Sequence, residues 1–85
     1  MRVLIPSALR SYTESAEANA SGATLDAVLD DLDHQYPGIR FRVIDEQSNI
    51  RRHVRVFVNG VAANTLSLNM QPEDEVILVQ ALSGG

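Results

Sequence analysis

The sequence contains no cysteine, no lysine and no tryptophan among its 85 residues. Without cysteine the chain can form no disulfide, no thiolate zinc site and no iron–sulfur ligation, and it has no cysteine nucleophile. Its two histidines alone would make a poor metal site, so we expect no metal. The sequence patterns of serine hydrolases, P-loop proteins, dinucleotide-binding proteins and zinc proteases are missing as well. The sequence therefore gives no sign of a catalytic centre of its own.

Long hydrophobic runs and a basic surplus are also missing. Residues 1–6 form too short an apolar run for a signal peptide, and no stretch approaches the roughly 20 apolar residues that span a bilayer. We therefore expect a cytoplasmic protein without a membrane partner. The net charge is −4 and all seven basic residues are arginines, scattered along the chain, so we expect no nucleic-acid partner. We interpret Arg51, Arg52 and His53 as polar strand-entry residues, with contact to a partner as the alternative.

What is present is the pattern of one small α+β domain covering residues 1–85. The predicted strands are 2–5, a weak one between 12 and 20, 54–58, a short edge strand within 61–70, and 75–82. The stretch 39–50 is predicted to be irregular or short-helical. A mixed sheet of four or five strands would wrap one main helix, with the first and last strands paired in its centre.

The main helix is predicted to follow Thr24, which is a suitable N-cap, and to end at Pro37-Gly38. Asp26 lies in the first turn, near the positive end of the helix dipole. Apolar side chains recur at helical spacing and form one stripe: Leu25, Val28, Leu29, Leu32 and Tyr36. Three aspartates lie on the opposite side of the helix from the apolar stripe: Asp30, Asp31 and Asp33. We interpret them as a solvated helix face, and the alternative is a metal or partner site.

The alternation of two strands predicts which side chains leave the core. Five apolar residues are expected to point inward: Val54, Val56, Val58, Val76 and Leu78. Phe57, Ile77 and Val79 would then share the outer face of adjacent strands and form an apolar patch that binds a partner. Two alternatives stay open, since the alternation could be displaced by one residue or a loop could cover the patch.

The last strand runs directly into Ala81-Leu82-Ser83-Gly84-Gly85. Glycine has no Cβ and adopts unusual backbone angles, so a Gly-Gly end can enter a narrow slot. Fully extended, residues 81–85 span at most about 17 Å, enough to carry a terminal carboxylate into another protein's active site. We expect residues 81–85 to form a flexible tail, and the alternative is a frayed terminus without a function.

The order of these elements and the tail resemble the β-grasp (ubiquitin-like) fold and the ThiS/MoaD family of bacterial sulfur carriers. The resemblance covers essentially the whole chain. It rests on Ile5-Pro6, Leu9-Arg10, Tyr12-Thr13, residues 31–39, residues 54–60, Asp74-Glu75-Val76 and Gly84-Gly85. Ile5-Pro6 and the Tyr-Pro-Gly-Ile segment at 36–39 look most similar to the longer carriers of cysteine or secondary-metabolite sulfur pathways.

The resemblance implies a carrier that acts as a protein cosubstrate, with no bound cofactor of its own. In the family, an E1-like enzyme uses ATP and magnesium to adenylate the C-terminal glycine, and a sulfur donor or sulfurtransferase converts it to a thiocarboxylate. A downstream synthase then uses the sulfur. Carried onto this sequence, Gly85 bears the reacting carbonyl, Gly84 fits the slot, and Ser83 and Leu82 guide the approach. All catalytic groups would lie in the partners.

Two other functions fit the same features. The chain could be a ubiquitin-like modifier whose Gly85 is linked to lysines of target proteins, or a β-grasp binding module whose Gly-Gly end is incidental. In the carrier interpretation, we expect the absence of lysine to prevent the carrier from acylating itself, because an acyl adenylate is attacked by amines and this chain has no lysine side chain. GC-rich codon usage is the alternative explanation for that absence.

Overall fold

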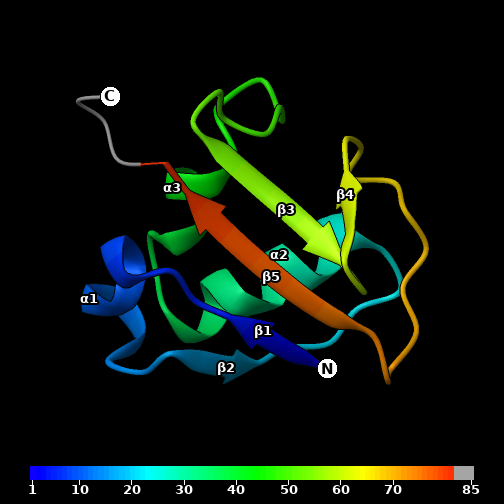
Figure 1. The fold of residues 1–85 in the computed structure, drawn as a ribbon, viewed down its shortest axis with the longest axis horizontal. Helices are drawn as coiled ribbons and strands as arrows, with labels where there is room; N and C mark the ends of the chain where they lie inside the picture. The colour runs from blue at the N-terminus through cyan, green and yellow to red at the C-terminus, as the bar shows by residue number, and fades with distance from the viewer. Residues whose placement is uncertain (82–85) are drawn as a thin grey trace.

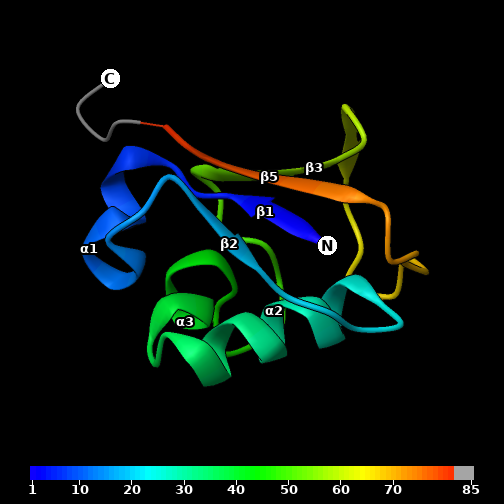
Figure 2. The same ribbon diagram turned by 90° about the horizontal axis from the view of Figure 1, so that it is seen from below.

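The computed structural model describes residues 1–81, and it consists of a five-stranded mixed sheet with its helices on one face (Figures 1 and 2). The strands are β1 (Arg2–Leu4), β2 (Glu17–Asn19), β3 (Val54–Val58), β4 (Val61–Ala63) and β5 (Glu75–Gln80). The helices are η1 (Ser7–Leu9), α1 (Arg10–Thr13), α2 (Leu25–Gln35) and α3 (Ile39–Val43). The predicted α+β class and the strand number are confirmed.

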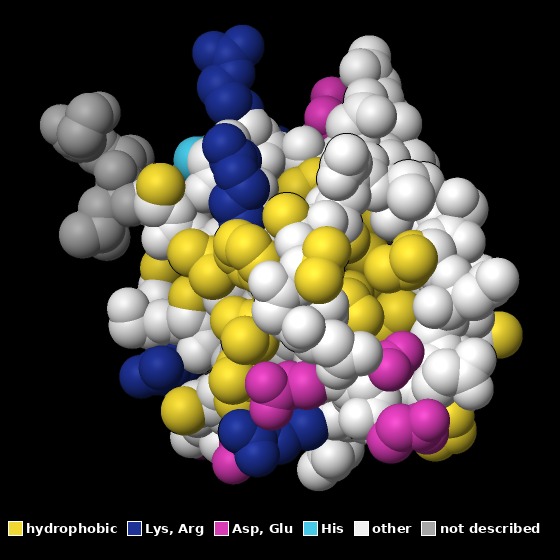
Figure 3. All heavy atoms as spheres, turned by 45° about the vertical axis from the view of Figure 1, so that its right-hand side comes forward, with side chains coloured by type: hydrophobic (Ala, Val, Ile, Leu, Met, Phe, Trp, Pro, Cys, Tyr) yellow, Lys and Arg dark blue, Asp and Glu magenta, His cyan; other side chains and the backbone are white. Residues whose placement is uncertain are grey.

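The strand order is β2-β1-β5-β3-β4, so the first and last strands lie side by side in the middle of the sheet. β1 pairs with β5 in parallel, with Val3 opposite Val76, whereas the other three pairings are antiparallel. This confirms the predicted central pairing. α2 and α3 lie on one face of the sheet, and hydrophobic side chains gather on the other face, which Figure 3 views obliquely.

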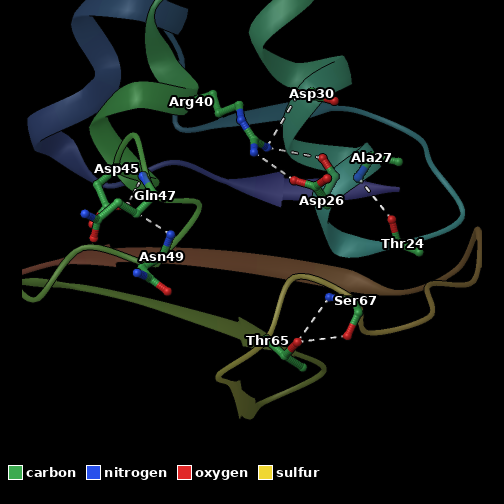
Figure 4. Close-up of polar contacts among 10 residues, drawn as sticks. All are labelled: Thr24, Asp26, Ala27, Asp30, Arg40, Asp45, Gln47, Asn49, Thr65 and Ser67. Carbon is green, nitrogen blue, oxygen red and sulfur yellow. Dashed lines mark hydrogen bonds and ion pairs between the residues drawn. The ribbon is translucent and has the colours of Figure 1, made fainter.

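The core lies between the sheet and α2, and the helix begins and ends where its sequence predicts. The Thr24 hydroxyl accepts a hydrogen bond from the backbone N–H of Ala27 at 3.2 Å, which caps the helix (Figure 4). The carbonyls of Leu66 and Leu68 accept the N–H groups of Asp26 and Leu25, both at 2.9 Å. Tyr36, the last member of the predicted stripe, is half-buried at the C-cap. The other four members are fully buried: Leu25, Val28, Leu29 and Leu32.

The aspartates of α2 hold neighbouring segments rather than only facing solvent. Arg40 of α3 forms ion pairs with Asp26 at 2.8 Å and Asp30 at 3.5 Å (Figure 4). Asp33 accepts the backbone N–H groups of Gly38 and Arg40 at 3.0 and 3.1 Å, and so fixes the start of α3. Within residues 1–81, no cluster of acidic or histidine side chains is suited to hold a metal ion. The predicted face is therefore not purely solvated, because Asp30 and Asp33, together with Asp26, connect α2 to α3.

The segment between β1 and α2 differs most from the sequence prediction. A strand was expected within 12–20, but Tyr12 and Thr13 belong to α1 and only Glu17–Asn19 pair with β1. The reason is a tertiary contact that alternation does not encode. Tyr12 packs against the core and Thr13 is buried, while Glu14 takes a left-handed conformation (φ 55°) that ends the short helix. The chain can then turn back to the sheet edge.

The remaining segments match their predictions. The stretch 39–50 contains the short helix α3, and the edge strand within 61–70 is β4. Asn59 and Gly60 connect β3 to β4, and both have positive φ (52° and 84°), as the tight hairpin turn requires. The last strand ends at Gln80, and the predicted extension to Leu82 lies outside the described residues.

Candidate functional site

The outer face of the central strands carries the predicted patch. Phe57 of β3 lies directly opposite Ile77 of β5, and the core-facing residues on either side of them are buried. Phe57 and Ile77 are half-buried, and Val79 is 40% exposed. The predicted alternation is therefore confirmed, and no residue of 1–81 buries the three side chains completely. The structure brings Phe57, Ile77 and Val79 together on adjacent strands.

Two further residues extend this surface, and the sequence analysis missed both. Leu4 of β1 lies opposite Ile77, and Ala62 of β4 lies opposite Phe57, so one apolar row crosses four strands. The alternation of β1 already contained the signal for Leu4, because its neighbours Val3 and Ile5 are core residues. We call Leu4, Phe57, Ile77 and Val79 the outer patch; Figure 3 shows such hydrophobic side chains gathered on this face.

The register that sets the two faces is held at one end by Asn59. Its backbone N–H donates to the Glu75 carbonyl at 2.9 Å, and its side-chain oxygen accepts the Glu75 N–H at 3.0 Å. Its amide nitrogen donates to Asp74 at 2.9 Å. Hydrogen bonds from the Gln71 N–H and from Asn59 lower the pKa of Asp74 below its ordinary value of 3.8. A slip of one residue would exchange the patch with the core, so this connection also fixes the site.

At its other end, β5 stops at Gln80, and Ala81 is the last residue that the structure describes. The N–H of Ala81 donates to the His53 carbonyl at 2.9 Å, which continues the β3–β5 ladder by one residue beyond Gln80. Val79 lies opposite Arg55. The outer patch therefore reaches the point from which the tail departs. The predicted tail residues Leu82, Ser83, Gly84 and Gly85 lie outside the described residues.

Arginine side chains border the patch at this same end, and Figure 3 shows arginines standing at its upper border. Arg55 donates to the carbonyls of Arg52 and Val54 at 2.9 and 3.1 Å, so its guanidinium folds back toward the start of β3. Arg51 donates to the Phe41 carbonyl at 2.7 Å and stacks over the Phe41 ring, 4.5 Å from its centroid. Arg51, Arg52 and His53 were interpreted as strand-entry residues, with contact to a partner as the alternative, and no sequence signal gives these side-chain conformations.

The whole chain from β1 to the last glycine matches one known family, the ThiS family, over residues 3–85. This chain belongs to the ThiS family. The sulfur carrier proteins CysO of Mycobacterium bovis and Mycobacterium tuberculosis are 35% identical to it over 89 residues, which cover 98% of this chain and 96% of theirs. The chain is thus a sulfur carrier of the ThiS/CysO type, a protein cosubstrate and not an enzyme.

Solved structures show the same fold. The crystal structure of Mycobacterium tuberculosis CysO has a TM-score of 0.88 and 33% identity, covering 95% of this chain and 98% of that one. The BexX/CysO complex of Amycolatopsis orientalis gives a TM-score of 0.89 at 28% identity, covering 99% and 98%. SAMP1, the small archaeal modifier protein 1, from Haloferax volcanii gives 0.81 at 28% identity, covering 100% and 98%. The ThiS-family chain therefore has the β-grasp fold, and no helix in residues 1–81 is long and apolar enough to cross a membrane.

Proposed function

We propose that the carboxyl group of Gly85 is the sulfur-carrying group, activated as an acyl adenylate and then converted to a thiocarboxylate. The observation that carries the proposal is the family match, which continues through Gly84 and Gly85. The placement of Ala81 supports it, because the central strand β5 ends at Gln80 and Ala81 is still held to His53, so the reactive end follows directly on the middle of the sheet. Residues 81–85 then serve as the tail of a single domain.

Activation is needed because a carboxylate is ionised at neutral pH and is a poor electrophile. A Gly85 oxygen attacks the α-phosphorus of ATP, pyrophosphate leaves, and the mixed anhydride with AMP forms. A sulfur nucleophile then attacks the Gly85 carbonyl and AMP leaves with the bonding electrons. ATP and magnesium belong to the E1-like partner. Gly84 lets the backbone enter a narrow channel, while Ser83 and Leu82 guide it.

The outer patch serves as the surface by which partners hold the domain while the tail reacts. Its three predicted members, Phe57, Ile77 and Val79, lie along the strands that lead to the tail, with Val79 two residues before Ala81. Apolar side chains that gather on one face and stay in contact with solvent are typical of docking surfaces. A CysO of Amycolatopsis orientalis forms a complex with BexX, which supports a protein partner for this carrier too. The activating enzyme, a sulfurtransferase and a sulfur-using synthase would take the same face in turn.

The similarity to CysO proteins supports placing this chain among the longer carriers of cysteine or secondary-metabolite sulfur pathways. The similarity to SAMP1 favours a second candidate function, in which Gly85 is joined to lysines of target proteins. Both functions begin with the same adenylate. They differ in the attacking nucleophile, which is a sulfur donor in one and an amine in the other.

The test is to incubate the chain with ATP, magnesium, sulfide and the candidate activating enzyme, and to weigh it intact. A carrier gains the mass difference between sulfur and oxygen, located on Gly85 by fragmentation. A variant lacking Gly85 should gain nothing while unfolding at the same temperature as the parent. Isopeptide-linked adducts in a lysate, without the sulfur-bearing form, would favour the modifier.

A further inference from the structure

A group of basic side chains gathers around the start of β3, which is the strand end that pairs with Ala81. We call Arg42, Arg51, Arg52, His53 and Arg55 the basic rim. All but the partly buried Arg51 are exposed, and the His53 carbonyl accepts the N–H of Ala81, the first residue of the tail. Arg55 lies opposite Val79 of the outer patch. Through His53 and Arg55 the rim thus adjoins both the tail and the outer patch, and the proposed function assigns it no role.

The arginines of the rim carry charge that the described chain does not neutralise. All ion pairs found within residues 1–81 involve Arg2, with Glu17 and Glu75, or Arg40, with Asp26 and Asp30. Arg51 and Arg55 are instead held by uncharged backbone carbonyls, which fix their guanidinium groups and leave the positive charge in place. The chain has a net charge of −4, yet it carries a positive cluster at the start of β3.

The shape of the rim fits side chains that insert between the arginines. Two shallow hollows of about 410 and 290 Å³ adjoin one another there, and Arg51 lines both. Arg52 and Arg55 border the larger hollow, and Arg42 and His53 border the smaller one with the exposed ring of Phe41. A guanidinium group presents two parallel donors that match a carboxylate, so each hollow suits an aspartate or glutamate side chain.

We infer that the basic rim binds acidic side chains around the mouth of the tail channel on the activating enzyme. This inference rests on the proposed function and names the chemistry of that partner surface. The observations favour an acidic protein over a nucleic acid, because the carboxylates of α2 and the net negative charge repel a long polyanion. The outer patch supplies apolar contact, and the rim orients the domain so that the tail faces the channel.

Exposed charges act chiefly on the rate at which two proteins associate. Removing charges from the basic rim should therefore change the KM for the carrier and the dependence of that KM on salt. The test measures adenylation by ATP–pyrophosphate exchange at several salt concentrations. Arg55→Gln should raise the KM roughly threefold and Arg52→Glu with Arg55→Glu roughly tenfold or more, with kcat unchanged. The KM of the parent should rise with salt, and the double variant should lose most of that dependence.

The matched control is Arg2→Gln, which removes one positive charge from the same outer face at the opposite end of β5. It should leave the KM and its salt dependence at the parent values. Thermal unfolding of every variant checks that the fold is kept. Equal KM values for Arg55→Gln, the double variant and Arg2→Gln would overturn the inference while leaving the proposed function intact. A parent chain that no activating enzyme adenylates would count against the proposed function itself, and the inference would fall with it.

Discussion

The two faces of the sheet are built from neighbouring residues of the same strands, yet they have different roles. On β5, Leu78 is buried beneath α2 and α3, while Ile77, its neighbour, faces away from them and is half-buried. Both side chains are aliphatic and of equal size. The difference lies only in what covers them: the helices cover the inner face, and no helix of residues 1–81 covers the outer face. Hydrophobic character alone therefore does not separate core from docking surface, but sheet geometry does.

The largest expected effect comes from the inner face. Leu78→Ala removes a side chain that is 2% exposed and leaves a cavity between β5 and the helices. We expect the free energy of unfolding to fall by about 2–5 kcal/mol, measured by denaturant titration. Ile77→Ala, one residue away, should cost clearly less because its side chain already meets solvent. Equal losses of unfolding free energy for Leu78→Ala and Ile77→Ala would contradict the assignment of Leu78 to the core and of Ile77 to the outer face.

The next effect belongs to the outer face. Phe57→Ser should raise the KM for adenylation of the carrier roughly thirtyfold, because a central apolar anchor contributes about 2 kcal/mol to binding. Val61→Ser is the matched control, since Val61 is 69% exposed and lies outside the outer patch. Its KM should stay at the parent value. If both serine variants bound the activating enzyme as the parent does, the outer patch would not be a docking surface.

A smaller, pH-dependent effect tests the connection that fixes the register. Hydrogen bonds from the Gln71 N–H and from Asn59 lower the pKa of Asp74 in the folded state. The ionised carboxylate therefore stabilises the fold at any pH above 3.8, the ordinary pKa of this group. This stabilisation is lost as the pH falls through the folded pKa. Asp74→Asn should be less stable than the parent at neutral pH, and the difference should shrink in acid. A difference that stays constant with pH would contradict this assignment.

The smallest effect concerns the missing lysines. Arg55→Lys places an amine on the outer face beside the tail root, whereas Arg2→Lys places one at the far end of β5. If the absence of lysine protects the adenylate, the first variant should form a minor self-linked product on activation, seen by intact mass as loss of water. The second should form less. No rise for either variant would favour codon usage as the explanation.

The periodic elements of this fold were predictable from the sequence because their side chains repeat with the geometry of the backbone. Val54, Val56 and Val58 alternate, and the α2 stripe recurs with helical spacing, so the core face of both elements and three of the four members of the outer patch were predicted. The helix cap at Thr24 and the turn at Asn59-Gly60 can be predicted from the sequence as well, since each depends only on the neighbouring backbone. The tail could be named from its glycines and from the family resemblance.

The parts that could not be predicted depend on contacts between distant segments. Tyr12 is drawn into α1 by packing on the core, and Asp33 receives N–H groups from the start of α3. The basic rim is a partial case. Arg51, Arg52, His53 and Arg55 are close together in the sequence. The approach of Arg42, the fold-back of Arg55 and the stacking of Arg51 on Phe41 depend on the fold. Side-chain conformations of this kind carry no periodic signal.

The most direct measurement is the intact mass of the parent chain and of its variant lacking Gly85, after incubation with the activating enzyme, ATP, magnesium and sulfide. The parent should gain the mass of one sulfur in place of one oxygen, with fragmentation locating the change on Gly85, and the shortened variant should stay unchanged. A shortened variant that acquires sulfur as readily as the parent would contradict the account.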